Sequence, residues 1–422
     1  MRSLIHGSTR SDQALGAVHA ILDRRLAPGA SRPLAVAFSG GGDSLALLLM
    51  TAAWARRARR EVVALTVDHR LQAASADWTH ACGATARRLG VGFRALTWEG
   101  PKPATGLPAA ARAARHAILA EAAREAGARV TLMGHTADDR MEAALMRAGG
   151  STTPDPREWA PSPAWPQGRG VFLLRPLLDV RRADLREWLG ARGETWIDDP
   201  ANEDLRYARS RARQAAKPGA PDAAADPPTH LSDHCAAQAG GVLSIGRRTL
   251  AKAPPADLRR FLALACVCVG GGTRRPASAS LERAAERLRG EAAVTLSLAG
   301  ARIEADAAQA IFMREAGEAA RGGLATLSLA AGEVGVWDGR FEIAATRPVE
   351  VRALAGLAGR LPRGRREGLQ AMPAAARPGQ PALVEGEDVS CPLLSPVAGV
   401  VVRARVADRL AAAAGLIDRE PG

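Results

Sequence analysis

Short apolar runs alternate with helix-like stretches along the first two hundred residues. The β-branched apolar runs predict strands, and the longer stretches between them predict helices. The predicted strands cover residues 34–38, 62–67, 91–98, 130–133 and 171–178, and the predicted helices cover 45–59, 73–89, 107–125, 138–147 and 182–192. Strands separated by single helices favour a parallel sheet built from βαβ units. The fold class that we predict is therefore α/β, with a doubly wound parallel sheet in the N-terminal domain.

The pattern changes beyond residue 213. Residues 214–230 are rich in Ala, Pro, Gly and Asp without periodicity, which is typical of a linker. Residues 242–289 are mostly helical in pattern, and short strand-like runs follow from residue 293. We therefore expect an α/β domain (1–213), a linker (214–230), a mainly helical domain (231–315) and a small α+β C-terminal domain (316–422).

Composition narrows the class of protein only modestly. The 47% of hydrophobic residues is ordinary for a globular chain and excludes wholesale disorder. Lys and Arg number 57 against 44 Asp and Glu, a net charge of +13, and nearly all of the positive charge is Arg. Arg binds phosphate through a planar fork, so the excess points weakly to nucleic acid. Nucleotide bias in the coding genome is an equally good explanation.

The cysteine pattern indicates a reducing compartment, and the apolar stretches indicate neither a signal peptide nor a membrane span. No pair of cysteines forms a C-x-x-C, and their scatter fits neither a disulfide framework nor a zinc site. The N-terminus lacks the apolar core of a signal peptide. The longest apolar stretch, residues 45–55, is shorter than the roughly 18 residues of a membrane span. We expect a cytoplasmic protein with no membrane partner.

A glycine-rich loop between the first strand and its helix is the strongest chemical signal. It consists of Ser39, Gly40, Gly41, Gly42, Asp43 and Ser44. Successive glycines let the backbone approach a ligand, and the following helix N-terminus attracts negative charge. The loop therefore predicts a phosphate or pyrophosphate site, with Asp43 placed to hold Mg²⁺. It has no Lys and is not a Walker A loop, nor is it a dinucleotide G-x-G-x-x-G. The alternative is a glycine turn with Asp43 as a helix cap.

Further candidates follow later predicted strands. Asp68 and His69 end the second strand, where the carboxyl end of a parallel strand faces a ligand. A lone histidine is otherwise more often structural. Arg112 and Arg115 lie three residues apart on one helix face and suit a phosphate, although a solvated basic face is an equal alternative.

A third block, around His135, opens the helix after the fourth strand. Asp139 and Glu142 in this block share one helix face. Carboxylates beside a phosphate loop need a cation between them, and Mg²⁺ or a lysine ammonium would meet that need. Helix capping by the acidic residues is the alternative.

A basic strip precedes the predicted linker. It consists of Arg206, Arg209, Arg211 and Arg213. Arginines at this spacing without alternating acids indicate contact with a phosphate backbone, and a solvated helix end is the alternative.

Together these motifs resemble the PP-loop ATP-pyrophosphatase superfamily and, within it, the tRNA(Ile)-lysidine synthetase family. The resemblance covers roughly residues 34–213 by motif, order and spacing, and is weaker after residue 242. It implies ATP as cosubstrate and Mg²⁺ as cofactor, with free L-lysine and the isoleucine tRNA bearing a CAU anticodon as partners. It further implies adenylation of the wobble cytidine (position 34), followed by attack of lysine at C2.

The resemblance also assigns roles to the candidate residues. Residues 39–44, Asp68 and His69 would bind ATP, and Asp43 would hold the metal. Catalytic roles would fall to Asp43, Arg112, Arg115, His135, Asp139 and Glu142. The basic strip and the mainly helical domain (231–315) would bind tRNA. Two other functions remain open on the sequence: a tRNA cytidine 2-thiolation enzyme, which shares the loop but usually needs paired cysteines, and a non-catalytic RNA-binding protein.

Overall fold

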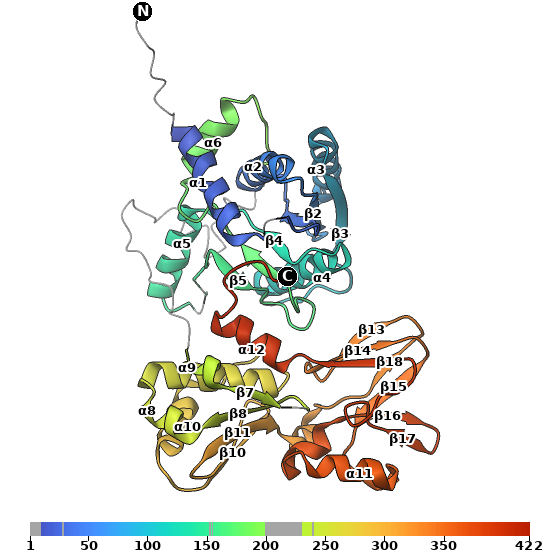
Figure 1. Ribbon diagram of the computed structural model, residues 1–422. Helices are drawn as coiled ribbons and strands as arrows, with labels where there is room; N and C mark the ends of the chain where they lie inside the picture. Colours follow the sequence, from blue (N-terminus) through green and yellow to red (C-terminus); the bar gives the residue numbers. More distant parts are fainter. Residues whose placement is uncertain (1–9, 28, 152, 154, 199–229, 239) are drawn as a thin grey trace, which may run out of the picture. The chain divides into compact units, whose positions relative to one another are not determined.

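A computed structural model describes residues 10–27, 29–151, 153, 155–198, 230–238 and 240–422 (Figure 1). The chain forms two compact units. Unit 1 comprises Met1–Pro227 and Ile417–Gly422, and unit 2 comprises Pro228–Leu416. Each unit is described by itself below.

Unit 1 contains a six-stranded sheet whose order is β3-β2-β1-β4-β6-β5. Its strands are β1 (Leu34–Ala37), β2 (Val62–Asp68), β3 (Gly92–Thr97), β4 (Val130–Leu132), β5 (Trp159–Pro161) and β6 (Phe172–Leu174). The strands are parallel except for β5, which runs antiparallel to β6. The strand order reverses between β1 and β4, and ligands bind at such a switch point in doubly wound sheets. The predicted fold class is confirmed.

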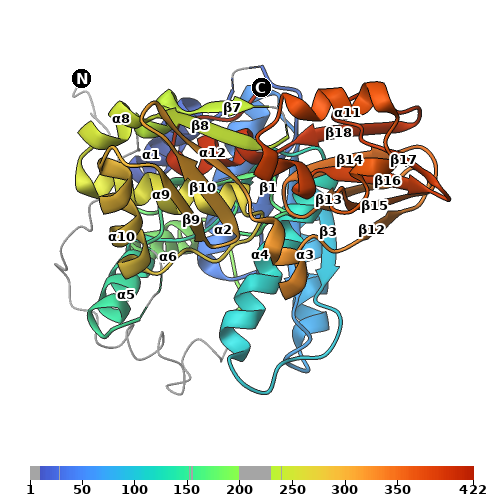
Figure 2. The same ribbon diagram turned by 90° about the horizontal axis from the view of Figure 1, so that it is seen from below.

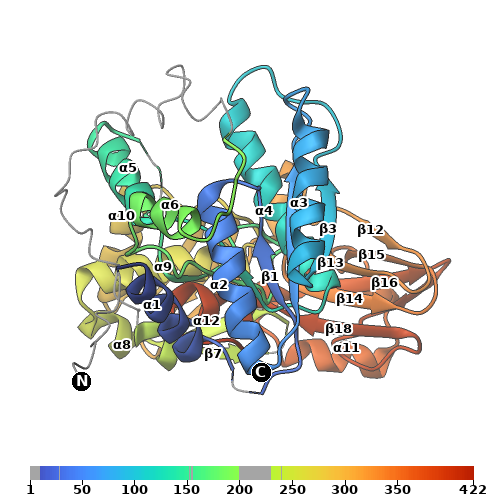
Figure 3. The ribbon, with the colours of Figure 1, turned by 90° about the horizontal axis from the view of Figure 1, so that it is seen from above.

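Helices cover both faces of this sheet (Figures 1 and 3). They are α1 (Arg10–Arg25), α2 (Gly42–Ala58), α3 (Ser75–Leu89), α4 (Leu107–Glu125), α5 (Ala137–Ala148) and α6 (Arg182–Gly190). Successive strand side chains point to opposite faces. Leu34 and Val36 of β1 accordingly join the core under α1, α2, α3 and α6, whereas Ala35 joins the core under α4.

Unit 2 begins with an antiparallel five-stranded sheet of order β7-β8-β11-β10-β9 (Figure 2). Its strands are β7 (Ala236–Gln238), β8 (Val242–Gly246), β9 (Val294–Leu298), β10 (Ala301–Ala305) and β11 (Gln309–Arg314). The helices of this part are α8 (Arg247–Lys252), α9 (Pro255–Val269), α10 (Ser278–Arg289) and α12 (Val406–Ala414). Helix α9 contributes Phe261 and Leu262 to the shared core.

The prediction of helix from residue 242 is wrong at its start, because Val242–Gly246 forms the buried strand β8 paired with β11. Residues 231–315 are thus α+β rather than mainly helical. The domain boundaries at 230/231 and 315/316 stay predictions.

The rest of unit 2 carries two small antiparallel sheets, of order β12-β15-β16-β17 and β13-β14-β18. Their strands are β12 (Leu327–Leu329), β13 (Val334–Trp337), β14 (Phe341–Ala345), β15 (Val349–Ala353), β16 (Pro381–Glu385), β17 (Asp388–Ser390) and β18 (Val400–Ala404). Helix α11 (Arg363–Gln370) and the short 3-10 helices η3 (Ala316–Arg321), η4 (Ala358–Arg360) and η5 (Ala374–Gly379) lie between strands, and η2 (His230–His234) opens the unit. None of the helices in the described part of the chain is both long and apolar enough to span a bilayer.

Candidate active site

The glycine-rich loop joins β1 to α2 and is held in shape by its own two serines. The Ser39 amide donates to Ser44 Oγ at 3.2 Å, and Ser44 Oγ donates to the carbonyl of Gly41 at 2.9 Å. Gly40 has φ +81°, and a Cβ there would come within 2.5 Å of Ile197 Cδ1. The Ile197 amide in turn donates to the carbonyl of Gly40 at 3.0 Å. Only glycine therefore fits at position 40, and the segment around Ile197 packs on the loop.

Gly134 brings the end of β4 close to this loop. A Cβ at position 134 would lie 3.1 Å from the carbonyl oxygen of Asp43 and 3.2 Å from Ser44 Cα. A side chain at this position would push the two strand ends apart. The motif that begins at Gly134 is thus placed directly beside the loop, at the switch point of the sheet.

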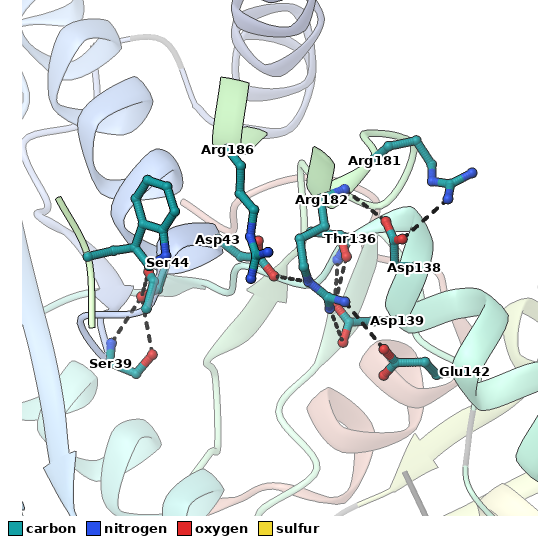
Figure 4. A network of polar contacts seen from close by, with 12 residues as sticks. Ser39, Asp43, Ser44, Thr136, Asp138, Asp139, Glu142, Arg181, Arg182 and Arg186 are labelled. Atoms are coloured by element: carbon teal, nitrogen blue, oxygen red, sulfur yellow. Dashed lines mark hydrogen bonds and ion pairs between the residues drawn. The ribbon is translucent and has the colours of Figure 1, made fainter. Parts of the chain in front are cut away.

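Three carboxylates from α2 and α5 gather around one guanidinium (Figure 4). We call Asp43, Asp139 and Glu142 the acidic group. Arg182 Nε donates to Asp43 Oδ2 at 2.9 Å, its Nη1 lies 3.4 Å from Glu142 Oε1, and its Nη2 lies 3.5 Å from Asp139 Oδ1. The side chains of Asp139 and Glu142 are only 8% and 2% exposed. The structure therefore brings together three of the predicted catalytic residues, with a cation among them.

Burial and the neighbouring charges shift the pKa values of Asp43 and Arg182. Burial raises the pKa of the Asp43 carboxyl, and the hydrogen bond from Arg182 opposes that effect. Burial lowers the pKa of Arg182, but the hydrogen bond to Asp43 and the charge of Asp139 outweigh it, so the pKa is raised overall. Arg182 is consequently a permanent cation of the site.

Helix capping accounts for part of the acidic motif. Asp139 Oδ2 accepts from the amide and the hydroxyl of Thr136, at 2.8 and 2.9 Å, which completes a capping box. Asp138 Oδ2 accepts from the Arg182 amide at 2.8 Å, at the start of α6. Asp139 therefore combines a capping role with its place in the acidic group, whereas Asp138 ties α5 to α6.

Arginines form a second set at the same edge of the sheet. We call Arg112, Arg115 and Arg175 the arginine group. Arg175 follows β6 and is buried, and burial together with the nearby charges of Arg112 and Arg115 lowers its pKa to about 10. Burial lowers the pKa of His116, and the charges of the same three guanidinium groups lower it further, to about 3. Such a concentration of positive charge, with Arg175 buried and Arg112 and Arg115 partly exposed, suits a phosphate.

His135 lies between the two groups. Burial lowers the pKa of His135 well below its usual value, and the guanidinium of Arg175 lowers it further. Arg175 Nε donates to His135 Nδ1 at 3.2 Å. Because a guanidinium only donates, Nδ1 is the unprotonated nitrogen and the neutral ring carries its hydrogen on Nε2. His135 thus offers one N–H donor at the site without adding charge.

Asp68 and His69 lie at the end of β2, as predicted. Asp68 Oδ1 accepts from the Arg70 amide at 2.7 Å, and the His69 ring packs edge-on against Trp98 at 5.9 Å. Burial and the charge of Arg115 lower the pKa of His69. His69 is therefore a neutral ring at the margin of the arginine group.

The structure leaves four predicted residues undescribed and adds two arginines to the site. Arg206, Arg209, Arg211 and Arg213 lie outside the described residues. Sequence reasoning missed the roles of Arg175 and Arg182, although both belong to one conspicuous stretch that runs from Arg175 to the start of α6. Within the described residues, no group of three or more His, Cys, Asp or Glu side chains is arranged to hold a metal ion.

Comparisons with known proteins decide the family. A model of the PP-loop domain matches residues 17–219. The tRNA(Ile)-lysidine synthase of Caulobacter vibrioides is 50% identical over 416 residues, covering 96% of this chain and 99% of the relative. This chain belongs to the tRNA(Ile)-lysidine synthase family. The synthase of Brucella ovis is 35% identical and covers 74% of each chain. As a family member, the chain is a PP-loop ligase that uses ATP in tRNA modification.

Solved structures of other proteins resemble this lysidine synthase family member more distantly. The U34-tRNA thiolase NcsA from Methanococcus maripaludis, with its [4Fe-4S] cluster, is 15% identical with a TM-score of 0.41, covering 48% of this chain and 72% of the thiolase. In the present chain all five cysteines are free thiols, and none is exposed. Family membership decides against both the thiolation alternative and the non-catalytic one.

Proposed function

We propose that this chain ligates free L-lysine to C2 of the wobble cytidine of the isoleucine tRNA that bears a CAU anticodon, and that it does so in the cytoplasm. The observation that carries the proposal is the pairing of the acidic group with the arginine group at one nucleotide loop. An ammonium suits the first and a phosphate suits the second. The name shared by the closely related synthases supports the same substrates.

In the first step, ATP lies on residues 39–44, with its adenosine part toward Asp68 and His69. The cytosine O2 attacks the α-phosphorus, the bond from that phosphorus to the bridging oxygen breaks, and pyrophosphate leaves. Arg112 and Arg115 stabilise the charge that develops on the α-phosphate or hold the target nucleotide. His135 contributes its N–H without competing for a proton.

In the second step, the ε-nitrogen of lysine attacks C2 of the adenylated cytidine. The bond between C2 and O2 breaks, and that oxygen leaves as part of AMP. Adenylation thereby turns the cytosine oxygen, a poor leaving group, into a good one. The ammonium must first lose a proton. Asp139 Oδ1 and Glu142 Oε1 both contact the guanidinium of Arg182, so we assign the lysine ε-nitrogen and the acceptance of its proton to this pair of carboxylates.

The residues fit a Mg²⁺ ion that is shared with the nucleotide. Mg²⁺ in nucleotide sites is usually held by one or two carboxylates and by substrate phosphates rather than by a complete protein cage. Asp43 supplies such a carboxylate in the first turn of α2, beside the loop. When bound, the ion neutralises charge on the pyrophosphate leaving group. We assign tRNA backbone contacts to Arg206, Arg209, Arg211 and Arg213 on their sequence pattern.

Transfer of labelled lysine tests the proposal. The chain is incubated with ATP, labelled lysine and CAU-anticodon isoleucine tRNA, and label on the tRNA and released pyrophosphate are measured together. We expect one pyrophosphate for each lysine transferred. Asp43→Ala should lower transfer by at least about a hundredfold, the effect of losing one preorganised electrostatic contact. Asp77→Ala, which removes an exposed acid from the first turn of α3, serves as the matched control. Near-normal transfer by Asp43→Ala would refute the site assignment.

A further inference from the structure

Arg182 occupies the place that the proposed function gives to the lysine ammonium. Its guanidinium lies within 3.5 Å of an oxygen of each member of the acidic group. The Arg182 side chain is 15% exposed, and Glu142 beneath it is 2% exposed. A positive charge of the chain itself therefore lies within the acidic group.

Stability alone does not account for this arrangement. Helix α6 is anchored by Leu185, Trp188 and Leu189 in the core, and its first turn is held by the bond from the Arg182 amide to Asp138. A buried ion pair generally adds little net stability, because desolvation offsets the attraction. The apolar anchors and the amide bond already fix the helix, so the contacts of the guanidinium are available for a further role.

The shortest contact of the guanidinium is the one with the glycine-rich loop. The 2.9 Å bond runs to Asp43, which belongs to the glycine-rich loop, whereas the contacts to Asp139 and Glu142 are longer, at 3.5 and 3.4 Å. A triphosphate on that loop would compete with Asp43 for Arg182, because phosphate binds a guanidinium through two parallel hydrogen bonds. A guanidinium drawn toward the phosphates would give up its contacts with Asp139 Oδ1 and Glu142 Oε1.

We propose that Arg182 is a positioning residue that occupies the proposed ammonium site at Asp139 and Glu142 until ATP binds and thereby makes lysine bind after ATP. This inference rests on the proposed function, since it takes Asp139 and Glu142 as the ammonium site. Two like charges cannot share that small space, so lysine and the inward position of Arg182 exclude each other. Withdrawal of the guanidinium toward the nucleotide couples the two substrates.

Equilibrium dialysis of labelled lysine tests the coupling. Lysine affinity is measured with and without α,β-methylene-ATP, whose α–β bond resists cleavage. For the unmodified chain, we expect the analogue to tighten lysine binding about tenfold, the factor for one hydrogen bond between charged groups. Arg182→Met should bind lysine about tenfold more tightly without the analogue, and the analogue should then change its affinity less than about twofold.

Two more variants keep the test decisive. Arg181→Met removes the neighbouring guanidinium, which is 45% exposed and pairs with Asp138, and should behave as the unmodified chain. Arg182→Lys keeps a cation but loses the fork, so a reduced coupling is expected from it even if Arg182→Met fails to fold, as judged by thermal unfolding. A full coupling in Arg182→Lys, or no gain in lysine affinity in Arg182→Met, would overturn the inference.

The same experiment separates this inference from the proposed function. If the unmodified chain transfers lysine to tRNA but shows no dependence of lysine binding on the analogue, only the role of Arg182 is refuted. If the chain neither binds nor transfers lysine, the proposed function fails and the inference fails with it.

Discussion

The end of the chain is tied to unit 1 by a buried ion pair whose loss should be costly. Arg60 Nη1 donates to Glu420 Oε2 at 2.7 Å, and Arg60 Nη2 donates to Glu420 Oε1 at 2.9 Å. Both side chains are 1% exposed. The Ala27 amide also donates to Glu420 Oε2, at 3.0 Å. Glu420→Ala would leave the guanidinium of Arg60 buried without its counter-charge.

The expected loss of stability follows from that burial. Removing one partner of a buried ion pair costs about 3–5 kcal/mol, mostly because the remaining charge stays desolvated. Glu99 forms an exposed pair with Arg70, with side chains 69% and 59% exposed, and supplies the matched control. Glu99→Gln should cost less than about 1 kcal/mol. The contrast between the two variants isolates the effect of burial.

Hydrogen exchange in increasing urea, read on peptides that contain β1, measures the stability of unit 1. We expect Glu420→Ala to lower it by about 3–5 kcal/mol. The double variant Arg60→Met with Glu420→Met removes both charges and should recover most of that loss, because an apolar pair of similar size is often as stable as the buried ion pair. A cost below about 1 kcal/mol for Glu420→Ala, or a double variant as unstable as the sum of its single variants, would refute the reasoning.

Two further predictions concern acid stability and tRNA binding. Because burial lowers the pKa of His116 to about 3, the unfolded chain takes up a proton there near pH 6.5 while the folded chain does not, so stability falls as pH drops from 6.5 toward 3. From pH 6.5 to pH 5 the chain should lose about 1–2 kcal/mol more than His116→Gln in urea unfolding; equal losses would contradict the burial of a neutral ring. Arg209→Ala with Arg211→Ala should weaken tRNA binding and reduce the slope of log affinity against log salt by about 1 per arginine. An unchanged slope in a filter-binding titration would argue against phosphate contacts there.

The local patterns of the sequence predict unit 1 well. The helix predicted over residues 107–125 has the bounds of α4, and the strands predicted over 34–38 and 62–67 match β1 and β2 within a residue. The reason is that buried parallel strands read as apolar runs and their helices as longer periodic stretches. The glycine loop was also predictable, since only glycine tolerates the backbone that a phosphate cradle requires.

Long-range contacts account for what the sequence leaves open. The sequence predicts helix where β8 lies, because β8 pairs with β11 about sixty-five residues further along the chain and no local signal marks that pairing. No local sequence pattern around Glu420 indicates that residues 417–422 belong to unit 1. There Glu420 forms its buried ion pair with Arg60. The roles of Arg175 and Arg182 depend likewise on the packing of β6 and α6 beside β1 and β4, which local periodicity does not specify.

The segregation of charge explains how one small site handles a phosphate and an ammonium together. The acidic group comes from α2 and α5, and the arginine group comes from α4 and the segment after β6, so each set has its own supporting elements. His135 lies between them as a neutral ring, because burial and then the charge of Arg175 lower its pKa well below the usual value. In a chain whose net charge is +13, an unshielded acidic group would draw the nearest arginine. Arg182 is that arginine, and its 2.9 Å bond to Asp43 joins it to the glycine-rich loop, as the proposed coupling of the two substrates requires.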